Sequence, residues 1–164
     1  MKTLLIMLAC CGLVLGCDYT VPLVTTPGIE IDKSVLGLWQ TATEDGKTEQ
    51  LLVLPLDKNE FLVSYPANTN EGLFARACLC RTGDKTLVQL KWFGTAEGKL
   101  PDDNRVFQFA SYTVTSDKLT VRLLNTDVVD KDVASTRELA KSIAANKDNT
   151  NLFKKAAVFM KVNK

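Results

Sequence analysis

The sequence predicts a mainly β protein, an eight-stranded antiparallel barrel with one C-terminal helix before the last strand. From residue 34 onward the chain is a succession of short β-rich runs separated by polar turn residues. Most of these links are far shorter than the dozen or so residues that a parallel crossover needs, so the strands form an antiparallel meander. One late stretch has a helical pattern, and a final β-rich run follows it.

The alternation of side chains along the predicted strands indicates how the sheet is covered. Leu119, Val121 and Leu123 share one face of their run. A sheet with one apolar face must cover that face, and a meander of this length does so by closing on itself. The first seven predicted strands span residues 35–42, 49–56, 60–66, 73–80, 86–93, 105–114 and 119–125.

The helix is predicted from its capping signals. Ser135 is an N-cap candidate three residues before Glu138, which is the spacing of a capping box, and Asn146 is a reasonable stop. We expect a helix over 136–145 that covers part of the outside of the barrel. The last strand lies within 156–163 and pairs with the first strand to close the barrel.

The first sixteen residues have the layout of a secretory signal. Lys2 is followed by an uninterrupted apolar stretch from Leu4 to Leu15, with the small residue Gly16 next. A helix that spans a bilayer needs about 20 apolar residues, so this stretch is too short for a permanent span. We expect residues 1–16 to be cleaved off as a signal peptide.

The end of this leader resembles the lipobox of bacterial lipoproteins. Val14, Leu15 and Gly16 directly precede Cys17, so two aliphatic residues and one small residue come before the thiol. The resemblance implies that Cys17 is the lipid attachment site, with an S-diacylglycerol group on its thiol and an N-acyl group on the new N-terminus. The alternative is an ordinary secretory signal followed by a structural or free cysteine.

Residues 17–33 are expected to form a lipid-anchored flexible tether, because prolines, a Pro-Gly pair and threonines occur there without a sustained period. Extended, such a tether reaches about 50 Å. The barrel domain is then 34–164. The lipoprotein resemblance implies a bacterial cell membrane location with the domain facing the periplasm, and Asp18 slightly favours the inner over the outer membrane.

The first predicted strand carries the sequence Gly37-Leu38-Trp39. With the meander, the late helix and the closing strand, it resembles the lipocalin-like, or calycin, architecture. It also resembles bacterial lipoproteins of unassigned function. The Thr-Asp-Tyr motif of true lipocalins is absent, since Thr126 and Asp127 are followed by valine. We expect Trp39 to be a core anchor and the barrel to be filled by side chains, with a ligand cavity as the alternative.

Several chemistries find no support in the composition. Twenty basic residues against nineteen acidic ones give a net charge of +1, without the basic block that a nucleic-acid binder carries. Zero histidines exclude Ser-His-Asp and Cys-His sites. The acid pairs Asp102–Asp103 and Asp130–Asp132 lie in turn-like segments, where solvated charge is expected, with an acid–base hydrolase that uses two carboxylates as the alternative. We therefore predict no enzyme activity, no catalytic residue and no cofactor.

Cys78 and Cys80 form the other candidate site, because residues two apart on a strand share a face. Their Cα atoms would lie about 6.5 to 7 Å apart, at the limit for a disulfide. No histidine or second cysteine pair completes a zinc site. Buried free thiols are the expected state, with a strained or intermolecular disulfide and a soft-metal site as alternatives, so no metal is predicted.

Three functions remain as hypotheses. The first is a lipid-anchored envelope protein whose barrel is a non-catalytic binding or interaction module, with another envelope protein as its partner. The second is a lipocalin-like carrier of a small hydrophobic ligand. The third is an inhibitor of an envelope-attacking hydrolase, because some lysozyme inhibitors are lipoproteins with small antiparallel barrels. All three partner with the membrane through the lipid anchor, and none with nucleic acid.

Overall fold

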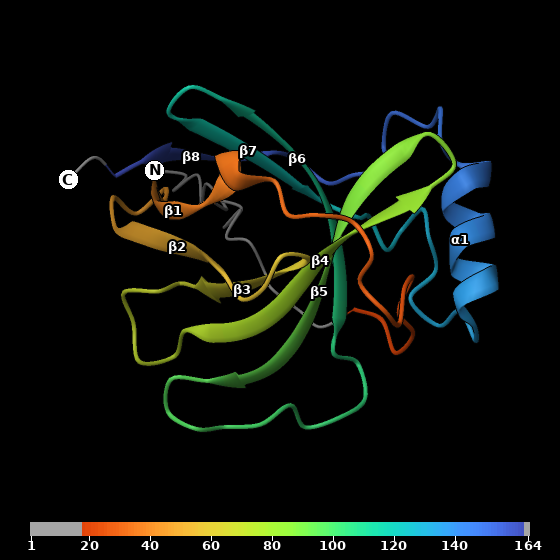
Figure 1. Cartoon of the computed structure of the whole chain (residues 1–164), viewed down its shortest axis with the longest axis horizontal. Helices are drawn as coiled ribbons and strands as arrows, with labels where there is room; N and C mark the ends of the chain where they lie inside the picture. Colours follow the sequence, from red (N-terminus) through yellow and green to blue (C-terminus); the bar gives the residue numbers. More distant parts are fainter. Residues whose placement is uncertain (1–17, 163–164) are drawn as a thin grey trace, which may run out of the picture.

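The computed structural model describes residues 18–162 and shows a closed eight-stranded antiparallel barrel with one α-helix before the last strand (Figure 1), which confirms the predicted fold class. Each strand pairs with the next, and β1 pairs with β8 to close the barrel. The elements are the 3₁₀ turn η1 Lys33–Val35, β1 Gly37–Ala42, β2 Thr48–Pro55, β3 Glu60–Tyr65, β4 Leu73–Thr82, β5 Lys85–Thr95, β6 Phe107–Thr115, β7 Lys118–Leu123, α1 Thr136–Ala145 and β8 Ala157–Lys161.

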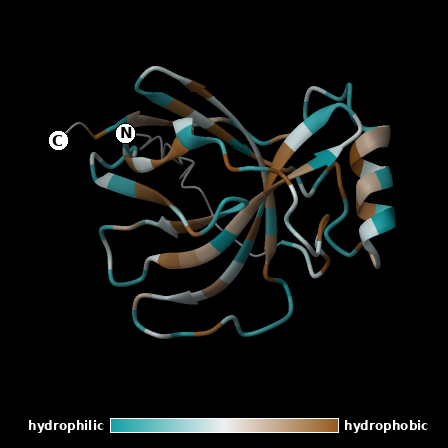
Figure 2. Cartoon of the chain, viewed as in Figure 1, coloured by the Kyte–Doolittle hydropathy of each residue, from teal (hydrophilic) through white to brown (hydrophobic). Residues whose placement is uncertain are grey.

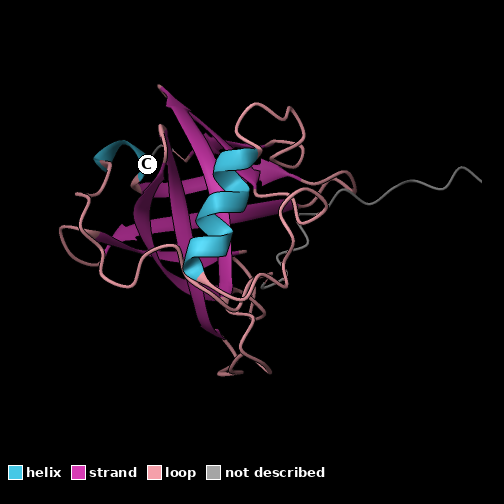
Figure 3. Cartoon of the chain, turned by 90° about the vertical axis from the view of Figure 1, so that its right-hand side faces the viewer, coloured by secondary structure: helices cyan, strands magenta, loops and turns pink. Residues whose placement is uncertain are grey.

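The buried residues form two cores, one inside the barrel and one outside it. The inner core is lined by the inward faces of the strands, and Leu119 and Leu123 lie there as their alternation predicts. The outer core lies between α1, the N-terminal segment and the outer faces of β4, β5 and β6. Figure 3 shows α1 lying across the strands, and Figure 2 shows hydrophobic residues along the strands and largely hydrophilic loops.

The helix begins and ends at the predicted residues. The Ser135 hydroxyl accepts a hydrogen bond from the Glu138 N–H at 3.2 Å, and Asn146 is the C-cap. The Glu138 carboxylate accepts instead from the N–H of Ala134, one residue before the N-cap, at 2.9 Å. Leu139 is fully buried in the outer core. The second layer expected on the outside of the barrel is therefore present.

The segment expected to be a flexible tether, 17–33, differs from that expectation over its described residues. Tyr19 is fully buried, exchanges backbone hydrogen bonds with Phe107 at the start of β6, and donates its hydroxyl to the Val129 carbonyl at 2.9 Å. Further along, the Gln89 side chain of β5 accepts a hydrogen bond from the Leu23 N–H at 2.6 Å. The segment is packed on the barrel because its apolar residues complete both cores.

Candidate functional site

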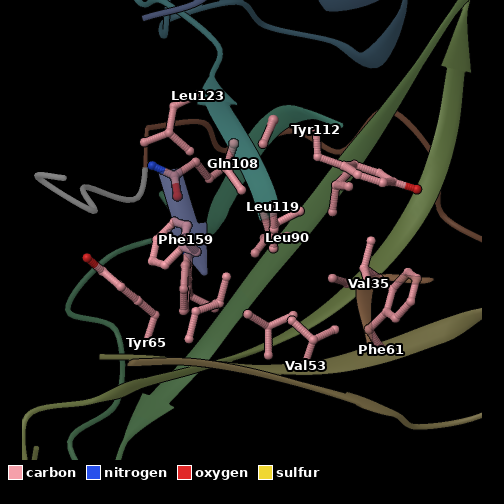
Figure 4. Close-up of a pocket in the computed structure, with 17 residues that line it drawn as sticks. Val35, Val53, Phe61, Tyr65, Leu90, Gln108, Tyr112, Leu119, Leu123 and Phe159 are labelled. Atoms are coloured by element: carbon pink, nitrogen blue, oxygen red, sulfur yellow. The ribbon is translucent and has the colours of Figure 1, made fainter. Parts of the chain in front are cut away.

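A small apolar cavity lies inside the barrel. Its volume is about 110 Å³, and 17 side chains from η1 and from β2 to β8 line it. Val35 of η1, Leu90 of β5 and Phe159 of β8 are among these side chains (Figure 4). The cavity is neither sealed nor a surface groove. A barrel of this size was expected to be filled by side chains, and the structure instead leaves this space open.

Two alanines explain the space. Ala77 of β4 is the register partner of Leu90, and Ala110 of β6 is the register partner of Val88. All four side chains line the cavity. Larger residues at the alanine positions would fill the barrel, since neighbouring inward side chains close the interior of small barrels. Small residues on β4 and β6, the two strands that flank β5, therefore create the cavity.

The tyrosine hydroxyls at the margin of the cavity are already engaged. The Tyr65 hydroxyl donates to the Glu49 carboxylate, and the Tyr112 hydroxyl donates to Asp32 Oδ2 at 2.9 Å. Burial, together with the neighbouring carboxylate, raises the pKa of each phenol well above its ordinary value. Figure 4 shows both hydroxyls pointing away from the centre of the cavity. The Tyr65 and Tyr112 rings form part of the apolar wall of the cavity, and their hydroxyls stay protonated.

Two polar side chains belong to the inner wall. Trp92 is 2% exposed, and its indole N–H is buried without a hydrogen-bond partner among residues 18–162. Gln108 is 1% exposed, and its amide donates to Asp18 Oδ2 at 3.5 Å. Burial raises the pKa of the Asp18 carboxyl, and Lys154 partly counteracts this. Trp92 thus has a buried, unused donor within the wall, and the surface that faces the cavity is apolar.

Neither polar residue was singled out from the sequence, although a signal existed. Gln108 shares its strand face with Ala110 and Tyr112, so it is a polar residue on an apolar face. A polar residue at such a position is informative because burying an amide is costly unless it is hydrogen-bonded. The unused donor on Trp92 depends on the packing of neighbouring strands and has no sequence signal.

Trp39 is a core anchor, as expected. It is fully buried, donates its indole N–H to the Val35 carbonyl at 2.8 Å, and has Lys161 Nζ 5.0 Å from its ring. Gly37 has φ +125°, and a Cβ there would lie 3.4 Å from the Lys161 side chain. The Gly-x-Trp sequence therefore joins η1 to the first strand, and Trp39 does not line the cavity.

The two cysteines of β4 lie away from the cavity, on the outer face of the strand. Both are buried free thiols, which confirms the expected state. Cys80 donates to the Leu87 carbonyl at 3.6 Å, and Cys78 accepts from the Gln89 amide at 3.8 Å. Burial raises the pKa of Cys78 to about 11 and that of Cys80 to about 12. The predicted lipid attachment site, Cys17, lies outside the described residues.

The acidic residues serve turns and surface pairs. Asp130 accepts from the Asp132 N–H at 2.9 Å, and Asp132 pairs with Arg105 at 2.5 Å. The Asp103 carboxylate accepts from the Arg105 N–H at 2.8 Å. Within residues 18–162, no cluster of three or more histidine, cysteine or acidic side chains is arranged to hold a metal ion. In the same residues, no helix has the length and apolar character needed to cross a bilayer.

Large apolar side chains are exposed at three places on the outer surface of residues 18–162. At the end of β2 and in the turn that follows it, Leu54 is 40% and Leu56 is 47% exposed, and on β8 Val158 and Met160 are each 44% exposed. At the end of β5 and in the loop that follows it, Phe93 is 44% and Leu100 is 76% exposed. None of these places is part of the cavity.

The fold and the site define a small closed antiparallel barrel with an apolar interior cavity. No protein-family model, curated protein or solved structure matches the chain. The function must therefore be inferred from the site alone.

Proposed function

We propose that this chain is a lipid-anchored bacterial envelope protein of the lipocalin-like kind, and that its barrel binds one small, neutral, apolar ligand without catalysis. The observation that carries the binding proposal is the apolar cavity inside the barrel. Cavities walled by apolar side chains with a few polar groups are the usual form of small-molecule sites.

The size of the cavity limits the ligand. Its volume is about 110 Å³, whereas drug-sized ligands occupy about 300 to 1,000 Å³. An engineered apolar cavity of about 150 Å³ binds benzene. The ligand is therefore of the size of a single ring or a short aliphatic chain.

The polar groups limit its chemistry. The Tyr65 and Tyr112 hydroxyls are occupied by Glu49 and Asp32. The Trp92 indole N–H is buried without a described partner but does not face the cavity, so the described wall offers a ligand no hydrogen-bond donor or acceptor. A charged ligand is disfavoured, because an ion buried without a partner costs far more than a neutral group.

The cavity is tested by filling it. Benzaldehyde and toluene are titrated into the protein by calorimetry, and we expect toluene to bind more tightly, because the apolar wall offers the aldehyde oxygen no donor. Ala110→Leu places a larger side chain at the wall and should abolish binding. Thr113→Leu, at an exposed position of the same strand, is the control. Equal binding by the parent and Ala110→Leu would show that the cavity is not the site.

The natural ligand is sought separately. Native mass spectrometry of the protein purified from its own cell envelope would detect a retained small molecule. A ligand-free barrel that captures one envelope protein would contradict the carrier function.

The anchor proposal rests on the sequence of residues 14–17, Val-Leu-Gly-Cys. Two acyl chains already give stable membrane attachment. Cys17→Ser should abolish acyl labelling and release the protein from the membrane fraction. Unchanged membrane fractionation and unchanged labelling would overturn the anchor.

A second candidate function is an interaction module, and one observation favours it. Val158 and Met160 expose apolar area two residues apart on the outer face of β8, which pairs with β1 and β7. Exposed apolar area on a folded domain is typical of interaction sites where it forms a contiguous patch. Met160→Glu should weaken capture of an envelope partner without changing ligand binding.

A further inference from the structure

We propose that the barrel docks directly on the phospholipid bilayer that holds its anchor, and that it presents one rim to the lipid. We define this rim patch as the exposed Phe93 and Leu100 together with the half-buried Phe74 and Phe107. The inference rests on the proposed lipid attachment at Cys17, and it adds an orientation and a lipid-contacting surface to that proposal.

The residues that directly follow Cys17 are already attached to the barrel, so no spacer separates the proposed anchor from it. The Asp18 N–H donates to the Phe107 carbonyl at 3.2 Å, and the Asp18 carbonyl accepts from Arg105 Nη1 at 3.2 Å. Tyr19, the next residue, is fully buried. Consecutive Cα atoms are about 3.8 Å apart. Acyl chains on Cys17 would therefore begin one residue away from the wall of the barrel.

The rim patch begins at Phe107. Asp18 and Tyr19, which we call the anchor segment because they directly follow Cys17, form backbone hydrogen bonds with this residue. Phe107 is the register partner of Lys91, whose Nζ lies 5.9 Å from the Phe107 ring. Phe93 lies two residues further along β5, on the same face as Lys91. The rings of Phe93 and Phe74 stack with their centroids 6.3 Å apart.

Leu100 extends the patch into the loop between β5 and β6, which runs along the bottom of Figure 1. Its Cδ2 atom lies 3.9 Å from the position of a Cβ on Gly94, the register partner of Phe74. The Thr95 N–H donates to the Lys99 carbonyl at 2.9 Å, which holds the loop back toward β5. Leu100 is the most exposed large apolar residue described, at 76%.

The composition of this rim fits a bilayer surface. Aromatic and leucine side chains partition into the boundary between headgroups and acyl chains, and lysine and arginine side chains contact the phosphates. Lys91 lies beside the patch, and Arg105 next to it already pairs with Asp132. Lys99 pairs with Glu97 at 3.0 Å, so the rim is not strongly basic, and apolar contact is expected to dominate. A single exposed leucine is common on protein surfaces. Leu100, however, lies at the same end of the barrel as Asp18 and Tyr19, which directly follow Cys17.

The test measures the environment of two labelled positions in the full, lipidated chain. Leu100→Cys lies on the rim, and Leu56→Cys lies in the turn between β2 and β3, at the opposite end of the barrel. Leu56 is 47% exposed and is the matched control. The native thiols of β4 are buried, so only the new cysteine reacts with a polarity-sensitive fluorophore. Each protein is reconstituted through its own anchor into phosphatidylcholine vesicles, some of which contain spin-labelled lipid.

We expect a blue-shifted emission and several-fold stronger quenching by spin-labelled lipid at position 100 than at position 56. Equal, water-like signals at both positions on an acylated protein would overturn the docking while leaving the anchor intact. The reverse pattern would place the opposite end on the lipid and would also overturn it. Intact-mass analysis that finds no acyl groups would overturn the anchor and the docking together. Unchanged tryptophan emission of the unlabelled variants verifies the fold.

Discussion

Replacing Tyr19 by alanine should strongly destabilise the barrel. The side chain is fully buried, its ring lies 5.3 Å from that of Phe109, and its hydroxyl donates to the Val129 carbonyl. Truncating a buried aromatic ring costs about 3 to 5 kcal/mol, and the lost hydrogen bond adds about 1 kcal/mol. The total, about 5 kcal/mol, is a large part of the stability of an ordinary domain, about 5 to 15 kcal/mol.

The assay is urea unfolding of the chain from Asp18 onward, which contains every residue of both cores. With a slope of about 2 kcal/mol per molar urea, Tyr19→Ala should lower the unfolding midpoint by about 2.5 M. Tyr19→Phe removes only the hydroxyl and should cost about 1 kcal/mol. Thr25→Ala, at an exposed position of the same segment, should stay within about 0.5 kcal/mol of the parent. If Tyr19→Ala unfolded at the parent midpoint, the segment would be a free tether and the packing described above would be refuted.

Three other predictions concern the helix, the thiols and the response to acid. Ser135→Ala removes the N-cap of α1 and should cost about 1 kcal/mol of unfolding free energy, measured in urea. The two cysteines of β4 should not react with a thiol reagent at neutral pH in the folded chain and should both react in denaturant, because burial raises their pKa values. Burial raises the pKa of Asp32, but hydrogen bonds donated by Ser34 and Tyr112 outweigh burial and lower it below 3.8. The stability that these bonds provide is therefore complete above about pH 4 and is lost as the pH falls through the lowered pKa. Tyr112→Phe should reduce this loss, measured as the unfolding free energy against pH, and an identical pH profile would contradict the role of this hydrogen bond.

Local patterns were sufficient to predict the barrel. Alternation and turn residues predicted all eight strands. Most links are short and polar and allow only an antiparallel neighbour, whereas β8 was predicted from its alternation after the helix. The capping signals at Ser135 and Asn146 predicted both ends of α1. The hairpin of β4 and β5 is longer than predicted, since pairing continues to Thr82 and Lys85 on either side of the turn, where Gly83 has φ +61°.

The packing of the N-terminal segment and the cavity could not be predicted in this way. Prolines and threonines in residues 17–33 resemble a linker, and the burial of Tyr19 depends on Phe109, which is distant in the sequence. Likewise, Ala77 and Ala110 read as ordinary strand residues, and the space beside them exists only once the barrel has closed. Both features depend on tertiary contacts that no local pattern encodes.

The pairing of β1 with β8 has a consequence for how the protein is made. Trp39 of β1 lies opposite Lys161 of β8. The second edge of β1 is therefore covered only after nearly the whole chain has been synthesised. During synthesis, that edge stays open and the barrel cannot close. A chain truncated before residue 157 lacks β8 and has two exposed strand edges. We expect such a chain to be degraded by proteases or to aggregate, and not to form a smaller barrel.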